Sequence, residues 1–141
     1  MNRQGKAPEP SSLLAAAMAA VFFLAVAAAA LGAPIRSSYG ARITADEPEY
    51  LLTALSLAED RSLDVSDELE AERYRAFHEV RIKPQARVLG GGRMVSPHDP
   101  LLPALLVPGA MAGGWLGAKL TLALFAGLLA ALLLWTAVRR F

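Results

Sequence analysis

Two stretches of the chain contain no charged residue and are apolar on every side. The first covers residues 11–35, and the second covers residues 120–138 directly after Lys119. As helices they would extend about 37 Å and about 28 Å, against roughly 30 Å of hydrocarbon in a bilayer. A helix of a soluble core would instead place polar residues at every third or fourth position. The pattern therefore predicts two transmembrane helices, over residues 11–35 and 119–138.

The first apolar stretch has a competing interpretation, a secretory signal peptide. Arg3 and Lys6 precede the stretch, and Ala30-Leu31-Gly32 resembles a cleavage site with small residues. The apolar region of a signal peptide usually has about 7 to 15 residues, and this stretch is longer. We therefore expect an uncleaved anchor. The alternative is a secreted domain that is released by cleavage near Gly32.

The segment between the two stretches, residues 36–100, is expected to be a loop that contains short amphipathic helices. Pro48 can begin the first helix, and leucine and alanine recur from there to Asp60 at helical spacing. Thr53 and Ser56 lie on the opposite side of that helix. This pattern predicts an amphipathic helix, of the kind that lies on a membrane surface.

The rest of this loop is more polar. Charges cover most faces of a second expected helix, from about Ser66 to about Glu79, which predicts a solvated helix. Residues 80–95 include Gly90-Gly91-Gly92 and predict a mobile loop with one short extended piece. A phosphate-binding loop of the Walker type would need Gly-x-x-x-x-Gly-Lys-Ser/Thr, which is absent. We therefore interpret the three glycines as a plain loop.

Residues 101–118 are apolar, but Pro103, Pro108 and four glycines interrupt them. Irregular backbone at membrane depth is tolerated only where protein or water covers its polar groups. This segment is therefore expected to be juxtamembrane or re-entrant, with Trp115 at the membrane interface. Together these elements predict an all-α membrane protein, in which two transmembrane helices are joined by an extracytoplasmic loop with short amphipathic and juxtamembrane helices.

Basic residues predict the orientation of the two helices. Residues 1–10 form a polar tail that is expected to be disordered, and residues 139–141 contain two arginines. Basic residues favour the cytoplasmic side, whereas loops longer than about 60 residues have little influence on topology. We therefore expect both termini in the cytoplasm of a bacterium, a multi-pass protein in the cytoplasmic membrane, and a loop that faces the cell envelope.

Composition excludes several classes of function. The net charge is only +1, from 14 basic and 13 acidic residues, so the chain lacks the basic field that would attract nucleic acid. The absence of cysteine excludes disulfides, thiolate metal sites and cysteine nucleophiles. Two spans and one loop are too few elements to enclose a large cavity. Besides the lipid bilayer, we therefore expect further membrane spans or a partner subunit as partners.

An acidic pair, Asp46 and Glu47, follows the first apolar stretch closely and precedes Pro48. A carboxylate held near a membrane surface can act as a general base, because lipid and helices can tune its pKa. The alternative is structural. Asp46 would cap the following helix, and Glu49, three residues later, would complete a capping box.

Three motifs carry a resemblance to a known family. They read Ala-Asp-Glu-Pro-Glu-Tyr-Leu-Leu-Thr-Ala over residues 45–54, Tyr-Arg-Ala-Phe over residues 74–77 and Ser-Pro-His-Asp-Pro-Leu-Leu-Pro over residues 96–103. With a span on either side, this arrangement resembles the N-terminal part of bacterial GT-C membrane glycosyltransferases. The closest pattern is that of the protein-mannosyltransferase and aminoarabinose-transferase group. The resemblance covers roughly residues 13–141, which correspond to only the first portion of such an enzyme.

The resemblance implies a function for the acidic pair. In that family an acidic pair in the first extracytoplasmic loop supplies the base that activates the acceptor, and Asp46 and Glu47 occupy that place. The family's donor is a sugar on polyprenyl phosphate, and the reaction inverts the anomeric centre. Members have many more spans, so this chain is expected to be an N-terminal module, inactive alone. The alternative is a non-catalytic two-span scaffold or accessory protein.

Tyr50 and His98 are the candidate substrate-binding residues. Tyr50 belongs to the motif with the acidic pair, and the turn Ser96-Pro97 holds His98 near the start of the segment that returns to the membrane. We expect no metal ligands among the site residues, because no histidine has the short-spaced partners of a zinc site. No cofactor is expected; the alternative is a divalent metal near Asp46.

Overall fold

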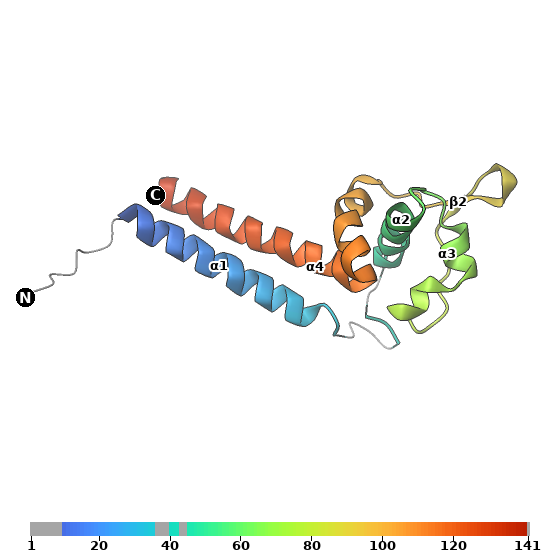
Figure 1. Cartoon of the computed structure of the whole chain (residues 1–141), viewed down its shortest axis with the longest axis horizontal. Coiled ribbons are helices and arrows are strands. Elements are labelled where there is room, and N and C mark those ends of the chain that lie inside the picture. Colours follow the sequence, from blue (N-terminus) through green and yellow to red (C-terminus); the bar gives the residue numbers. More distant parts are fainter. Residues whose placement is uncertain (1–9, 36–39, 43–44, 141) are drawn as a thin grey trace, which may run out of the picture. The chain divides into compact units, whose positions relative to one another are not determined.

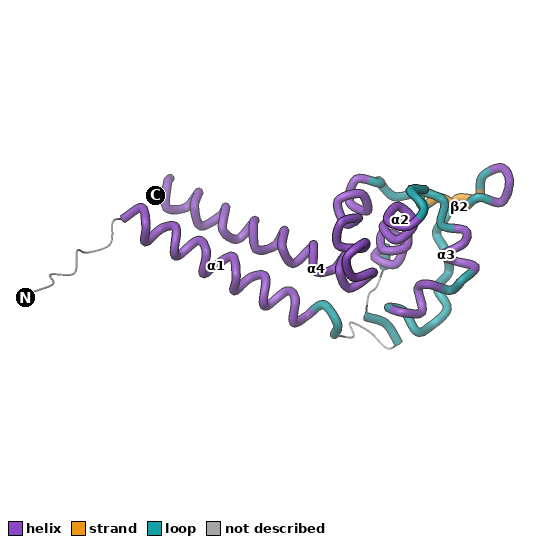
Figure 2. The backbone as a smooth tube through the Cα atoms, viewed as in Figure 1, coloured by secondary structure: helices purple, strands orange, loops and turns teal. Residues whose placement is uncertain are grey.

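The computed structural model describes residues 10–35, 40–42 and 45–140, and helix is its main element (Figure 2). Most of the predicted N-terminal tail, and Phe141, lie outside the described residues. The elements in chain order are α1 (Pro10–Gly32), α2 (Glu47–Glu59), α3 (Ser66–Glu70), η1 (Arg73–Ala76), β1 (Arg87–Val88), η2 (Gly90–Gly92), β2 (Met94–Val95) and α4 (Leu101–Arg140). The chain divides into two units, one made of residues 1–29 and 123–141, the other of residues 30–122.

The first unit consists of α1 and the C-terminal part of α4, which lie side by side and run in opposite directions (Figure 1). Both helices have the length and apolar composition to cross a membrane. Their leucines are widely exposed, with Leu24 71% and Leu133 61% accessible. At Gly127 an added Cβ would lie 2.5 Å from Val26 Cγ2 and 2.9 Å from Phe22 Cδ2. Glycine therefore lets the two helices approach closely, as small residues do between membrane helices.

In the second unit, α2 is the central helix. The core cluster consists of Leu51, Leu52, Ala54, Leu55, Val65, Tyr74, Phe77, Leu106, Ala110 and Ala118. The expected polar face of α2 is buried as well, because Thr53 is only 3% and Ser56 0% exposed. The Ser56 hydroxyl lies 2.7 Å from the Asp64 carbonyl oxygen and 3.1 Å from that of Ser62, so both hydrogen-bond contacts are internal. The prediction of a surface-lying amphipathic helix was therefore wrong, since short polar side chains can be buried when the backbone satisfies them.

The single solvated helix expected from Ser66 to Glu79 is absent. Instead α3 ends at Glu70, and Glu72 takes a left-handed conformation with φ 50° before the short turn η1. This break lets Tyr74 and Phe77 both reach the core, where they are 3% and 0% exposed. Burial of two aromatic side chains outweighs the roughly 1 kcal/mol cost of one left-handed residue.

A small antiparallel hairpin occupies part of the expected loop over residues 80–95. Strand β1 pairs with β2 in the register Arg87 with Val95 and Val88 with Met94. Gly91 and Gly92 form its turn at φ 78° and 80°, where a side chain would be strained. The three glycines thus turn a β-hairpin, and the description of the protein as all-α omits this small ribbon.

Helix α4 is broken at Gly113 and Gly114, whose φ/ψ values are non-helical. The break folds the first arm back against the start of the second. In a straight helix Gly109 and Gly117 would lie about 12 Å apart. Here a Cβ added to Gly117 would lie 2.0 Å from the Gly109 carbonyl oxygen. The interrupted segment predicted for residues 101–118 is therefore a helical corner, made possible by two glycines at the crossing.

Candidate functional site

The predicted site residues gather at the first turn of α2, within the second unit. Asp46 is the N-cap residue of that helix and Glu47 is its first residue. His98, more than 50 positions later, places Nε2 4.0 Å from Asp46 Oδ1. Its ring also lies beside the Tyr50 ring, with centroids 5.0 Å apart and planes tilted by 34°. The structure therefore brings Asp46, Tyr50 and His98 together.

The side chain of Asp46 does not cap α2, and the predicted capping box is absent. Asp46 makes no side-chain capping hydrogen bond. Its Oδ1 instead accepts a hydrogen bond of 3.2 Å from Gln85 Nε2, while Glu49 Oε1 accepts one of 3.0 Å from the Gln85 backbone N–H. Both carboxylates therefore bind the loop that precedes β1. The Asp46 side chain remains 53% exposed and accessible to a ligand.

Glu47 has a different partner from Asp46. Its Oε1 lies 3.2 Å from Lys119 Nζ, whose side chain is only 14% exposed. The same ammonium donates a hydrogen bond of 3.2 Å to the Arg42 carbonyl oxygen. The Arg42 guanidinium in turn lies over the Trp115 ring, 5.9 Å from its centroid. Glu47 thus belongs to a charged network that joins α2 to the corner of α4.

Glu49 is a site feature that the sequence interpretation assigned only to capping. It is 2% exposed, and its Oε2 has no hydrogen-bond partner among the described residues. Glu49 also lines a cavity of about 190 Å³. The other residues that line this cavity are Ala45, Pro48, His78, Arg81, Ile82, Lys83 and Gln85. A basic rim therefore lies next to the acidic first turn of α2. The only sequence signal for Glu49 is its position one turn before Leu52 and Thr53, on the same buried face.

The backbone before Asp46 is held by contacts with the end of η1. Ala41 forms a β-bridge with His78, and the Glu79 N–H donates a hydrogen bond of 2.7 Å to the Gly40 carbonyl oxygen. Ala45 itself adopts φ 54°, which is uncommon for a residue with a side chain. The chain therefore enters α2 through a constrained turn, and such constrained backbone often accompanies functional sites.

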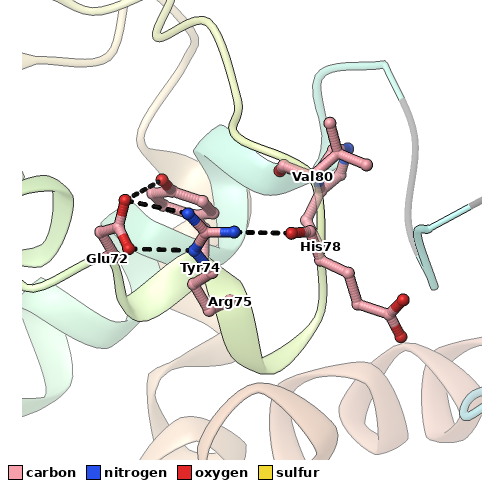
Figure 3. A network of polar contacts seen from close by, with 6 residues as sticks. Glu72, Tyr74, Arg75, His78 and Val80 are labelled. Atoms are coloured by element: carbon pink, nitrogen blue, oxygen red, sulfur yellow. Dashed lines mark hydrogen bonds and ion pairs between the residues drawn. The ribbon is translucent and has the colours of Figure 1, made fainter.

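A polar network braces this contact (Figure 3). The Tyr74 hydroxyl and the Arg75 guanidinium both donate to the Glu72 carboxylate, at 3.0 Å to 3.2 Å. Arg75 also donates a hydrogen bond of 2.7 Å to the Glu79 carbonyl oxygen. The hydrogen bond from Arg75 lowers the pKa of Glu72, so this carboxylate stays charged. His78, expected on a solvated helix, instead lies beyond η1 with Nδ1 2.6 Å from the Val80 carbonyl oxygen.

Asp46 presents an exposed carboxylate beside a histidine. His98 Nε2 lies 4.0 Å from Asp46 Oδ1, which is beyond hydrogen-bond distance, and the Tyr50 ring packs beside the His98 ring. His98 Nε2 is buried and has no hydrogen-bond partner in the part of the chain that the structure describes. Among the same residues, the acids and histidines at this site do not form a group of three closely spaced metal ligands.

Comparisons with protein-family models, curated proteins and solved structures found no match to this chain. What the structure defines is a mostly helical protein with two long apolar helices that could span a membrane. The segment that connects them in the sequence contains the buried helix α2, which has an acidic first turn.

Proposed function

We propose that this chain is the N-terminal module of an inverting glycosyltransferase of the GT-C type. It would transfer a sugar from a polyprenyl-phosphate donor at the outer face of the bacterial cytoplasmic membrane. The observation that carries the proposal is the geometry of Asp46, an exposed carboxylate that does not cap its helix and that lies 4.0 Å from His98 Nε2. The sequence resemblance supplies the reaction type.

In the proposed reaction, Asp46 is the general base. Its carboxylate accepts the proton of the acceptor hydroxyl while that oxygen attacks the anomeric carbon of the donor sugar. The new bond forms on the face opposite the leaving group, so the anomeric configuration inverts. The bond between the anomeric carbon and the phosphate oxygen breaks, and polyprenyl phosphate leaves with the electron pair. His98 and Tyr50 would orient the reacting sugar beside Asp46.

Two features give other residues distinct roles in this proposal. The ion pair with Lys119 makes Glu47 a positioning residue that fixes the first turn of α2. Arg81 and Lys83 line the cavity beside Glu49, and cationic side chains there can neutralise the phosphate of the donor. The remaining membrane spans or a partner subunit would complete the groove for the lipid, because the described cavity is too small for a polyprenyl chain.

The proposed topology has both termini in the cytoplasm and the second unit outside it. It is supported by the antiparallel pairing of α1 with α4, which brings the described N-terminal and C-terminal ends to one end of the pair (Figure 1). Because the chain has no cysteine, a single introduced cysteine reports location without background. We expect Glu70→Cys, at an exposed position, to react with a membrane-impermeant maleimide in intact spheroplasts. Labelling only after lysis would place the unit in the cytoplasm and refute the proposal.

Activity is tested with the protein purified from its native membrane together with any subunits that co-purify. The preparation is placed in liposomes with labelled polyprenyl-phosphate sugars. Asp46→Asn is expected to lower kcat about 10²-fold to 10⁴-fold, the contribution typical of a general base. Lys83→Ala is expected to raise KM for the donor, and Glu70→Gln, the control, should behave as wild type.

Transfer at the wild-type rate in both Asp46→Asn and Glu47→Gln would refute the catalytic role. If those variants retain transfer but lose a co-purifying subunit, the accessory-protein hypothesis takes its place. That hypothesis gives the acidic first turn a structural role, as the contacts of Glu47 and Glu49 already illustrate.

A further inference from the structure

Three carboxylates outside the proposed site converge at the junction of α2 and α3. Asp60 is the C-cap residue of α2, and Asp67 and Glu68 lie in the first turn of α3. One carboxylate oxygen from each residue lies within 4.8 Å of the others. Asp60 and Asp67 are exposed, whereas Glu68 is buried behind them. The cluster therefore opens to solvent on one side and ends on a buried acid on the other.

Glu68 is the unusual member of the cluster. It is only 2% exposed, and neither of its carboxylate oxygens has a hydrogen-bond partner among the described residues. Burial of a carboxylate without a partner is costly, and native proteins usually pair or coordinate such groups. Burial, followed by the adjacent Asp67 carboxyl, raises the pKa of Glu68 to about 8. A cation bound at this position would compensate the cost of burying the Glu68 carboxylate without a partner.

No side chain of the described residues supplies that charge directly. Arg73 donates hydrogen bonds to both carboxylate oxygens of Glu59, and its electrostatic attraction to Glu68 is weaker than its attraction to Glu59. The C-terminal end of α2 carries the negative end of the helix dipole, so it adds to the local negative potential. Both the side chains and the helix end therefore favour a cation between Asp60, Asp67 and Glu68.

We propose that Asp60, Asp67 and Glu68 form a binding site for a calcium ion that ties the end of α2 to α3. Calcium binds oxygen ligands at 2.3 to 2.6 Å in flexible geometry, so two of its ligand oxygens lie up to about 5 Å apart. That range includes the spacing of these three carboxylates. Magnesium requires near-ideal octahedral geometry at shorter distances, which two adjacent residues and one helix cap do not readily supply. Water on the open side would complete the coordination shell.

This inference is independent of the proposed glycosyl transfer, because it concerns a different junction of the unit. Its consequence is structural. An ion that binds only the folded chain stabilises the fold in proportion to the logarithm of its concentration above the dissociation constant. Calcium would therefore hold α2, which also carries Asp46 at its other end, against the segment that contains α3.

The test uses the full chain in mild-detergent micelles after treatment with a chelator. Calcium chloride is added during isothermal titration calorimetry, and thermal unfolding is followed in parallel. We expect one calcium ion per chain and a midpoint of unfolding that rises with calcium concentration. Glu68→Gln and Asp67→Asn should weaken binding at least tenfold. Glu70→Gln removes an exposed acid from the same helix and should bind as wild type.

Several results would overturn the site. They are the absence of binding heat at millimolar calcium in the wild type, equal binding by Glu68→Gln, or an equal response to magnesium. A proton could take the place of the ion; the unfolding midpoint would then depend on pH and not on calcium, which would also overturn the site. If Glu68→Gln does not fold, the exposed Asp60→Asn and Asp67→Asn variants decide the matter, since both must weaken binding tenfold.

Discussion

The corner of α4 offers the sharpest test of the fold. Gly117→Ala adds one methyl group where the two arms of α4 cross. An ideal Cβ at this position would lie 2.0 Å from the Gly109 carbonyl oxygen and 2.9 Å from the Gly109 carbonyl carbon. Both atoms belong to the backbone, so no side-chain rotation can relieve the clash. The arms must separate by more than 1 Å to restore a normal contact of roughly 3.5 Å.

Gly117→Ala is expected to destabilise the protein, whereas the same substitution inside a helix usually stabilises it. Inside a helix, replacing glycine by alanine normally stabilises a protein by about 0.5 to 1 kcal/mol. Overpacking of a tight contact costs about 1 to 3 kcal/mol, and more when backbone must move. We therefore expect Gly117→Ala to lower the free energy of unfolding by about 2 kcal/mol. Because Lys119 follows two residues later, separation of the arms should also loosen its ion pair with Glu47.

The measurement is denaturant unfolding of the full chain in micelles, followed by the fluorescence of Trp115. This residue packs against Phe77 with ring centroids 6.1 Å apart, and Trp135→Phe in all variants removes the other tryptophan signal. Gly90→Ala is the control, because a Cβ there meets nothing within 4 Å. That variant should stay within about 0.5 kcal/mol of wild type. A Gly117→Ala protein as stable as wild type, or more stable, would refute the crossing.

Two further predictions concern charged groups of the second unit. In chelator-treated buffer, the raised pKa of Glu68 means that the folded state holds this proton up to about pH 8, whereas the unfolded chain releases it near 4.5. The contribution of protonated Glu68 to the free energy of unfolding is therefore fully present below pH 4.5 and is lost as the pH rises towards 8, by up to about 5 kcal/mol relative to Glu68→Gln. If the free energies of unfolding of wild type and Glu68→Gln changed in parallel between pH 5 and 9, the raised pKa of buried Glu68 would be contradicted. Lys119→Met keeps the aliphatic stem but leaves Glu47 without its ammonium partner, and should cost about 1 to 2 kcal/mol. Adding Glu47→Gln to Lys119→Met should lower the free energy of unfolding only slightly more than Lys119→Met alone. A coupling energy near zero between the two substitutions in a double-mutant cycle would contradict the ion pair.

Part of the candidate site was accessible from the sequence because it is local. A proline at the start of a helical pattern predicted a helix from Pro48 to Asp60, and the observed helix α2 covers Glu47–Glu59. The acidic pair therefore lies where the sequence predicted, at the first turn of a helix. The two apolar helices were equally accessible, because a long uncharged run excludes most other structures. Their insertion in a membrane stays a prediction.

The contacts that give the site its geometry lie far apart in the sequence. Nothing in the local pattern links Asp46 to Gln85 or His98, or Glu47 to Lys119, because each pair is joined only when α2 packs in the core. The same limit applies to the wrong capping box, which fits every local rule until Gln85 offers the carboxylates another donor.

Sequence by itself determined the elements whose stability is local, which are the apolar helices and the start of α2. Tertiary structure alone decided where they bury their faces. Packing placed Thr53 and Ser56 inside, broke the expected second helix at Glu72, and folded α4 back at Gly113 and Gly114. The physical reason is that periodicity along a chain records which residues prefer burial, whereas the partner that buries them is set by contacts between distant segments.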